Sequence, residues 1–335
     1  MKRESSKQLS PHSRSTRTQL VRPDENQPKT LSLSPPQLPP PSQLPPGYDY
    51  ADHLEASLLF YEAQRSGKLP ATNRIRFRND SSLTDKAPDG SDISGGYHDA
   101  GDHLKLNFPM AWTFTHLAWG YLDFRKGYDA AGQAAQMRAT LQWAADYFMR
   151  CHFDELSYVA QVGTESADHG FWGRPEDMKM ARPAIAIGPG KPGSDLAGQT
   201  AAALAAIAMA FEAVDPEYAM RCEAHARELY TLATRWEGKF SKSLSVRSFL
   251  NFEFWEGRER KEKKKKEDEI CIPLLLKEKK PEKKLQVGNM YPSNTHLDDL
   301  TMAAGWLARR TGEPAYLADA ANYWKRMRSE EAGVS

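Results

Sequence analysis

The stretch SGGYHDAGDHLKLNFPM, residues 94–110, carries more information about fold and chemistry than any other part of this 335-residue chain. It places two aspartates, Asp99 and Asp102, three positions apart, with a histidine next to each of them, His98 and His103. The glycine pair near its start allows a sharp turn and a close approach of the backbone to a ligand. Two carboxylates held this close shift each other's pKa, and such a pair suits a base that takes a proton from water.

The residue types alone leave three interpretations of this segment open. Asp and Gly are common in turns, so an acidic turn ahead of the helix that begins near Phe108 is one of them. The Asp-x-x-Asp-His pattern also offers oxygen and imidazole ligands to a metal. The third interpretation is a catalytic carboxylate pair, which the spacing does not favour over the other two. The choice among the three interpretations therefore depends on the rest of the sequence.

Further segments accompany this stretch in the order of a known family. They are Tyr48–Pro70, Arg74–Leu83, Ala167–Pro183, Lys191–Phe211 and Asp298–Leu317. With them the chain resembles glycoside hydrolase family 9, the endo-β-1,4-glucanases or cellulases, over most of residues 48–244 and 288–325. The resemblance implies cleavage of internal β-1,4-glucosidic bonds with inversion, and a cellulose-like β-glucan or cello-oligosaccharide as partner.

Helical periodicity dominates the part of the chain that resembles the family. Little of the sequence alternates as strands do, so we predict an all-α fold, and the resemblance implies an (α/α)6 barrel that is incomplete in this chain. The run 109–125 is apolar nearly all round, which is typical of a buried helix. We expect Ser194 or Asp195 to cap the helix over 196–213. The other predicted helices are one that carries Leu54, Leu58 and Leu59 and ends before Gly67, and those over 130–152, 216–236, 297–311 and 314–327.

Composition divides the chain into three parts. Residues 1–46 are rich in Pro and Ser and cannot bury a core, so we expect a disordered segment, with a ligand for a proline-binding domain as a less favoured interpretation. Residues 47–335 form a partial catalytic domain, interrupted at 245–287 by a lysine-rich insertion that we expect to be disordered. A retained intron accounts for that insertion better than a phosphate-binding patch does.

Charge and cysteine content exclude several classes of partner. The net charge is +1, and no apolar run is long enough to cross a membrane, so we expect no nucleic-acid or membrane partner and a monomer. The three cysteines, Cys151, Cys222 and Cys271, form no CxxC pair. Family members are extracellular, although the chain starts without an apolar secretory signal.

The resemblance assigns roles to the residues of the central stretch. The second Asp of the DAGD run, Asp102, corresponds to the base that activates water, and Asp99 to the partner that holds this water. We expect His98 and His103 to position the loop, since structural histidines are common.

The loop around residues 167–183 corresponds to the family's substrate cleft. His169, Phe171 and Trp172 are the expected sugar-binding groups, with Trp172 as a stacking platform for the apolar face of a pyranose. Phe171 replaces the usual Trp. Burial of Trp172 is the alternative interpretation. Arg182 is a further candidate for binding sugar, or else for a loop contact or a salt bridge.

The expected metal content is at most a structural calcium ion, and no cofactor is required. Asp298 and Asp299 correspond to an acidic pair that binds calcium in some members of the family, but the residues upstream, Asn294 to Leu297, depart from the pattern. A place in the first turn of a helix explains both acids equally well.

The general acid of the family has no counterpart in this sequence. The family's Asn-Glu motif does not occur after Asp319, and Glu330 and Glu331 lie in a short polar tail. We therefore expect this polypeptide to hydrolyse cellulose poorly or not at all and to expose apolar helix faces. A carbohydrate-binding fragment without catalysis is the alternative.

Overall fold

The computed structural model describes residues 49–244 and 290–333, and these are predominantly helical. The predicted segments 1–46 and 245–287 lie outside the described residues. The long helices are α1 (Tyr50–Ala63), α2 (Asn107–Asp123), α4 (Ala134–Cys151), α6 (Ser194–Phe211), α7 (Pro216–Arg235), α10 (Leu297–Thr311) and α11 (Pro314–Glu331). Short helices are α3 (Arg125–Ala130), α5 (Glu165–Asp168), α8 (Phe240–Ser243) and the 3-10 turn η2 (Pro175–Asp177).

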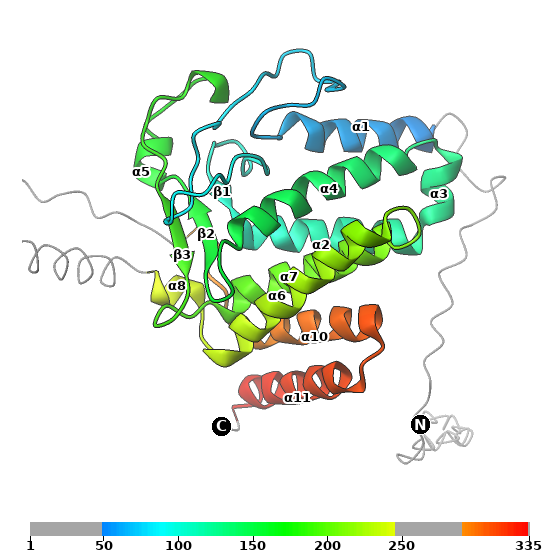
Figure 1. Cartoon of the computed structure of the whole chain (residues 1–335), viewed down its shortest axis with the longest axis vertical. Helices are drawn as coiled ribbons and strands as arrows, with labels where there is room; N and C mark the ends of the chain where they lie inside the picture. The colour runs from blue at the N-terminus through cyan, green and yellow to red at the C-terminus, as the bar shows by residue number, and fades with distance from the viewer. Residues whose placement is uncertain (1–48, 245–289, 334–335) are drawn as a thin grey trace, which may run out of the picture.

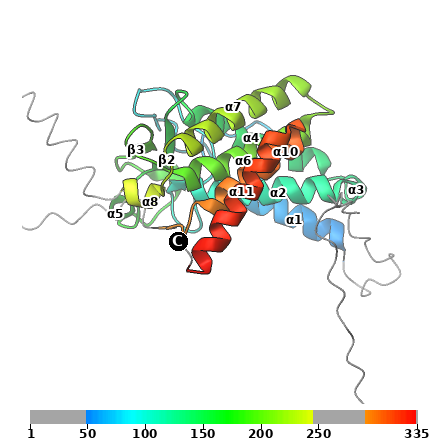
Figure 2. The same ribbon diagram turned by 90° about the horizontal axis from the view of Figure 1, so that it is seen from below.

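Helix α6 forms the centre of the core. Alanine-rich and buried along almost its whole length, it packs against α2, α7 and α10. Gly198 allows one of these approaches, since a Cβ there would lie 3.2 Å from the Asp299 carbonyl oxygen of α10. Figure 1 shows the helices lying roughly side by side from α1 at the top to α11 at the bottom, and Figure 2 shows α6 between α7 and α2. The predicted helices are therefore all present within the described residues.

Local sequence explains where several helices begin and end. Asp215 accepts a hydrogen bond from the Tyr218 amide at 2.9 Å, and Pro216 occupies the first position of α7, where its missing N–H costs nothing. Pro314 opens α11 in the same way, and Gly312 ends α10 with a left-handed φ of 73°.

The strands of the described residues form one three-stranded antiparallel sheet, which the sequence did not predict, although the strand content is small, as expected. Its order is β1 (Lys105–Leu106), β2 (Tyr158–Val162) and β3 (Ala184–Ile187), with Lys105 opposite Val162 and Tyr158 opposite Ile187. β2 is buried on both faces, so its residues YVAQV show no alternation of apolar and polar side chains. The sheet lies at one end of the helices, beside α5 and α8 (Figure 1).

The predicted capping of α6 was wrong. Ser194 and Asp195 do not cap α6 from outside: the helix begins at Ser194 after Gly193. The buried Ser194 hydroxyl donates to the Ala233 carbonyl of α7, and Asp195 accepts from the Phe240 amide, so both side chains tie α6 to its neighbours. The segment 74–83 forms turns, and Ser81 makes one isolated bridge with Gly67.

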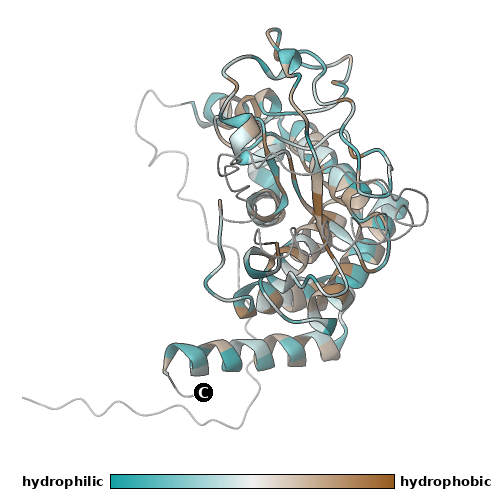
Figure 3. Cartoon of the chain, turned by 90° about the vertical axis from the view of Figure 1, so that its left-hand side faces the viewer, coloured by the Kyte–Doolittle hydropathy of each residue, from teal (hydrophilic) through white to brown (hydrophobic). Residues whose placement is uncertain are grey.

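Helix α6 is also the one described helix whose length and composition would allow it to cross a membrane. However, 94% of that window is buried by the rest of the protein, as in the core helix of a packed domain. In Figure 3 brown, apolar residues lie mainly in the interior, whereas α11, next to the C-terminus, is largely teal.

Candidate active site

The predicted catalytic stretch forms a tight loop between Tyr97 and β1. The Asp99 amide donates to the Leu104 carbonyl at 2.8 Å, and the Asp102 amide donates to the Asp99 carbonyl at 3.1 Å. Gly96 has a φ of 72°, and a Cβ at that position would lie 2.6 Å from the Tyr147 ring. Glycine is therefore required there on both conformational and steric grounds, and it fixes how the chain enters the loop.

Asp102 lines an open pocket of about 610 Å³. One carboxylate oxygen accepts from the Leu104 amide at 3.1 Å, and the other lies 3.2 Å from Nε2 of His169. Partial burial raises the pKa of Asp102 and nearby Asp168 adds to the rise, while the bonds from His169 and Leu104 oppose it. A carboxylate with a raised pKa is a stronger base than an ordinary aspartate, and this one faces open space.

Asp99 lies on the same loop as Asp102, close enough for the Asp102 charge to affect its pKa. It lines a smaller pocket of about 130 Å³ and accepts a hydrogen bond from the Tyr291 hydroxyl at 2.9 Å. Burial raises the pKa of Asp99, the Tyr291 bond lowers it, and Asp102 makes a smaller rising contribution. Asp102 thus shifts the pKa of Asp99 as expected of the pair, although burial is the larger cause. At Asp102 the neighbouring carboxylate that raises the pKa is Asp168.

The wall of the Asp102 pocket carries the predicted sugar-binding groups His169, Phe171 and Trp172. The Trp172 side chain is 99% exposed, so the alternative of a buried tryptophan is wrong. Phe171 packs edge-on against the His103 ring, with 5.6 Å between centroids. Its position supports the loop, and Trp172 presents a free aromatic surface to the pocket.

Asp168, which sequence reasoning did not select, joins this group. Its buried carboxylate accepts from the His103 amide at 3.2 Å, while its other oxygen is buried without a hydrogen-bond partner. Ligand atoms of Asp102, Asp168 and His169 lie within 4.8 Å of one another, so they could hold a cation. The sequence feature that could have indicated Asp168 is its position directly before His169 and close to the aromatic residues Phe171 and Trp172.

Arg182 lies behind the pocket and does not line it. Its side chain is 8% exposed, pairs with Asp85 at 2.9 Å and donates to the His103 carbonyl at 2.8 Å. The buried Lys105 ammonium lies 2.8 Å from the other Asp85 oxygen. Among the roles considered for Arg182, these contacts support a loop contact and salt bridge in place of a sugar contact.

His98 is buried, and its Nε2 lies 3.3 Å from the Ser82 hydroxyl. Burial and the nearby cations Lys105, Arg182 and Arg78 keep its pKa well below the usual value, so the ring is neutral. It packs edge-on against His103. These contacts support the expected positioning role of both histidines.

Asp298 and Asp299 lie in the first turn of α10, as the structural interpretation expected. Asp298 is exposed, whereas Asp299 is buried, with one oxygen lacking a hydrogen-bond partner. Burial, then Asp298 and Asp195, raise the pKa of Asp299 well above its usual range, which favours a neutral acid. Neither residue belongs to the groups of three or more carboxylate, imidazole or thiol ligands found among the described residues. A calcium ion at this pair stays a prediction.

Comparison with known proteins identifies the family. A sequence profile described as glycosyl hydrolase family 9 matches residues 50–334. The chain belongs to this family. Endoglucanase B of Cellulomonas fimi is 37% identical over 290 residues, which cover 87% of this chain and 24% of that protein. Endoglucanase 15 of Arabidopsis thaliana is 38% identical over 269 residues, covering 80% of this chain and 46% of that protein.

Solved structures of family 9 enzymes confirm the predicted fold. The endoglucanase of the termite Nasutitermes takasagoensis aligns with a TM-score of 0.70 and 42% identity, covering 84% of this chain and 56% of that one. The cellulase Cel9M of C. cellulolyticum in complex with cellobiose aligns with a TM-score of 0.66 and 28% identity, covering 82% and 54%. The all-α, (α/α)6-barrel prediction is thus confirmed, and the chain spans about half the length of these structures.

Proposed function

We propose that this chain supplies the water-activating half of an inverting endo-β-1,4-glucanase. The observation that carries the proposal is the Asp102 carboxylate, which has a raised pKa and faces an open pocket walled by an exposed tryptophan. The endoglucanase names of the relatives support the same reaction.

In the proposed reaction Asp102 accepts a proton from water as the water attacks the anomeric carbon. His169 and the Leu104 amide hold the carboxylate in place from two sides. Asp99, oriented by Tyr291, serves as the second acceptor for the attacking water. Because Asp99 and Asp102 project from a loop closed by its own backbone bonds, little reorganisation is needed during the reaction.

The substrate we propose is a β-1,4-glucan, bound in an extracellular setting where such polymers occur. Trp172 offers its exposed ring to the apolar face of one glucose unit, and His169 and Arg174 line the same pocket with polar groups. A family 9 cellulase has been solved with cellobiose, which supports this choice of ligand. We further propose that the chain acts on the polymer as a monomer.

Leaving-group protonation is the part of the reaction that the described residues do not supply. Within the ranges 49–244 and 290–333, two carboxyl side chains line the pocket of about 610 Å³. They are Asp102, the proposed base, and Asp168, whose ligand atoms lie within 4.8 Å of those of Asp102 and His169. We propose that none of the described residues serves as the general acid. Substrates that need no acid should then react best.

The test compares two substrates with the purified 335-residue chain. We expect hydrolysis of 2,4-dinitrophenyl β-cellobioside, whose leaving group departs without protonation, and little release of sugar from cellotetraose. Proton NMR of the first product should show α-cellobiose, the inverted anomer. First formation of β-cellobiose would contradict inversion. Binding of cellotetraose with no hydrolysis of either substrate would indicate a binding fragment.

A further inference from the structure

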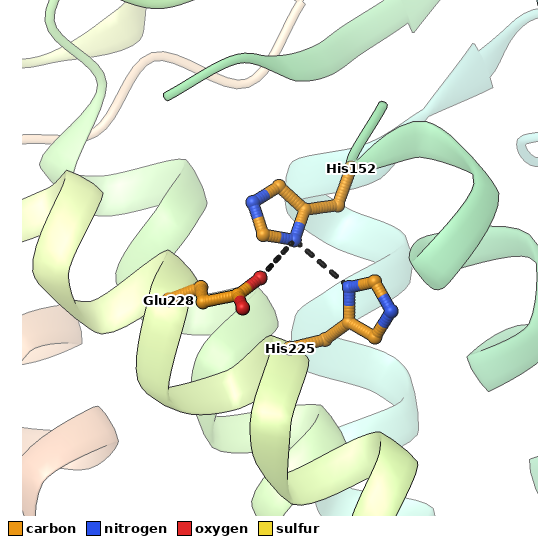
Figure 4. Close-up of side chains that lie close together, drawn as sticks. All are labelled: His152, His225 and Glu228. Atoms are coloured by element: carbon orange, nitrogen blue, oxygen red, sulfur yellow. Dashed lines mark hydrogen bonds and ion pairs between the residues drawn. The ribbon is translucent and has the colours of Figure 1, made fainter. Parts of the chain in front are cut away.

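Two histidines and a glutamate meet where the end of α4 contacts α7, in a cluster separate from the pocket of Asp102. His152 follows the last residue of α4, and His225 and Glu228 lie three positions apart on one face of α7. Nδ1 of His152 lies 2.9 Å from Nδ1 of His225 and 3.7 Å from a carboxylate oxygen of Glu228. Figure 4 shows the three side chains pointing toward one another.

The two imidazole rings point ligand atoms at a common space. They stand edge to face, with centroids 5.1 Å apart and planes at 71°, so the Nδ1 atoms face each other without stacking of the rings. The His152 side chain is 1% exposed, whereas that of Glu228 is 48% exposed. One ligand is therefore fixed by packing while the other side stays open, which gives an ion a path of entry from solvent.

The charges around the cluster favour a cation. Burial lowers the pKa of His152 to about 4 and also lowers that of His225, so both rings are neutral at pH 7. The Glu228 carboxylate consequently has no charged partner inside the cluster. Asp154 and Glu155 add negative potential at His152. Without an ion, one hydrogen bond joins the two neutral imidazoles directly.

We propose that His152, His225 and Glu228 form a binding site for zinc or a similar divalent transition metal, with water as the fourth ligand. All three ligand atoms lie within 4.8 Å of one another. Zinc bonds to nitrogen and oxygen of about 2.0–2.2 Å separate two ligands of a tetrahedral site by roughly 3.3–3.6 Å. The observed separations of 2.9 and 3.7 Å lie on either side of that range, so small side-chain shifts suffice.

The site would act by joining two elements. It fastens the end of α4 to α7 at the point where the chain turns toward β2. Strand β2 pairs with β1, and β1 directly follows the loop that carries Asp99 and Asp102. Metal binding to the folded chain alone would raise its stability by mass action. The expected role is structural, because the metal is held away from the groups assigned to glucan hydrolysis.

The test uses the full chain after removal of metals with EDTA. Titration with ZnCl2 in a calorimeter should show one saturable site with micromolar or tighter affinity, and zinc should raise the Tm. His225→Gln and Glu228→Gln should each weaken zinc binding at least about tenfold and abolish the rise in Tm. Both side chains are partly exposed, so these variants should fold. Calcium and magnesium, which prefer oxygen ligands, should not compete.

Two controls separate this site from other zinc-binding groups. Glu217→Gln removes the same charge from the first turn of α7 and should bind zinc as the unaltered chain does. His169→Gln disrupts the other three-ligand cluster found in the described part of the chain and should also leave the binding intact. The proposal is overturned if the folded chain shows no saturable zinc binding, or if His169→Gln abolishes binding while His225→Gln does not.

Discussion

Tyr291 reaches Asp99 from 192 residues away, and its hydroxyl stabilises the charged form of that carboxylate. In the Tyr291→Phe variant the bond that lowers the pKa of Asp99 is lost, while the burial that raises it remains. Asp99 assists the reaction in its charged form. In the variant Asp99 is therefore protonated, and hydrolysis is lost, at a higher pH than in the unaltered chain. We therefore expect the acidic limb of the pH–rate profile for 2,4-dinitrophenyl β-cellobioside to move toward higher pH.

The matched control for this variant is Tyr50→Phe, which removes the same hydroxyl at the exposed start of α1. Its profile should overlay that of the unaltered chain. An unchanged acidic limb in Tyr291→Phe would remove Tyr291 from the account of the site.

Trp172 gains contacts only when sugar is bound, because its side chain is already fully exposed. Trp172→Ala should weaken cellotetraose binding about tenfold, or ~1.4 kcal/mol, in a calorimetric titration. Its free energy of unfolding should change by less than about 0.5 kcal/mol, as for other surface positions. Trp324→Ala, at an exposed tryptophan of α11, is the control; equal losses in both variants would argue against a platform at Trp172.

The sequence predicted the residues of the site that lie in recognisable motifs, and not those that reach it from elsewhere in the chain. The DAGD run marked Asp99 and Asp102 as candidates, and the family resemblance supplied their roles and that of His169. The roles of Tyr291 and Asp85 could not be predicted from the sequence, because they arise only when the fold brings these residues to Asp99 and Lys105. Nothing in the local sequence of either residue marks such a contact.

At the scale of elements, Asp85 joins three segments behind the pocket. It is buried and pairs with Lys105 of β1 and with Arg182, just before β3. Asp85→Ala leaves two buried cations without a carboxylate partner, so we expect a loss of about 3–5 kcal/mol in the free energy of unfolding, measured in urea. Lys105→Met should cost less, because Asp85 keeps Arg182. The reverse order of the two variants would show that Asp85 does not organise these segments.

Element type was predictable where periodicity was long, and less so elsewhere. The helices over 216–236, 297–311 and 314–327 were predicted to within a few residues of α7, α10 and α11, because proline, glycine and capping residues mark their ends. The sheet was missed because β1 has two residues and β2 is buried on both faces. Short buried strands leave no period of two in the sequence.

At the scale of the whole molecule, one apolar surface stands out among the described residues. It is a depression of about 390 Å³ between α2, α10 and α11. Its apolar lining residues are Trp119, Met302, Trp306, Trp324 and Met327. Contiguous apolar surfaces of this kind promote association. We expect sedimentation velocity to show a monomer at low concentration and reversible self-association as concentration rises.

Two lysine variants test whether that surface is responsible. Trp324→Lys places a charge in the depression and should shift the association to higher concentration. Phe60→Lys replaces a similarly exposed aromatic of α1, outside the depression, and should leave the association unchanged. Equal behaviour of the two variants would show that association does not involve this surface.

The central claim is that Asp102 activates water, and the most direct test is the rate of 2,4-dinitrophenyl β-cellobioside hydrolysis by the full chain and by Asp102→Asn. This substrate isolates the base, because its leaving group needs no acid. We predict a fall in kcat of about 10²–10⁴-fold, the usual contribution of a general base, with cellotetraose binding and Tm retained. A variant that hydrolyses the substrate at the unaltered rate would contradict the assignment of Asp102.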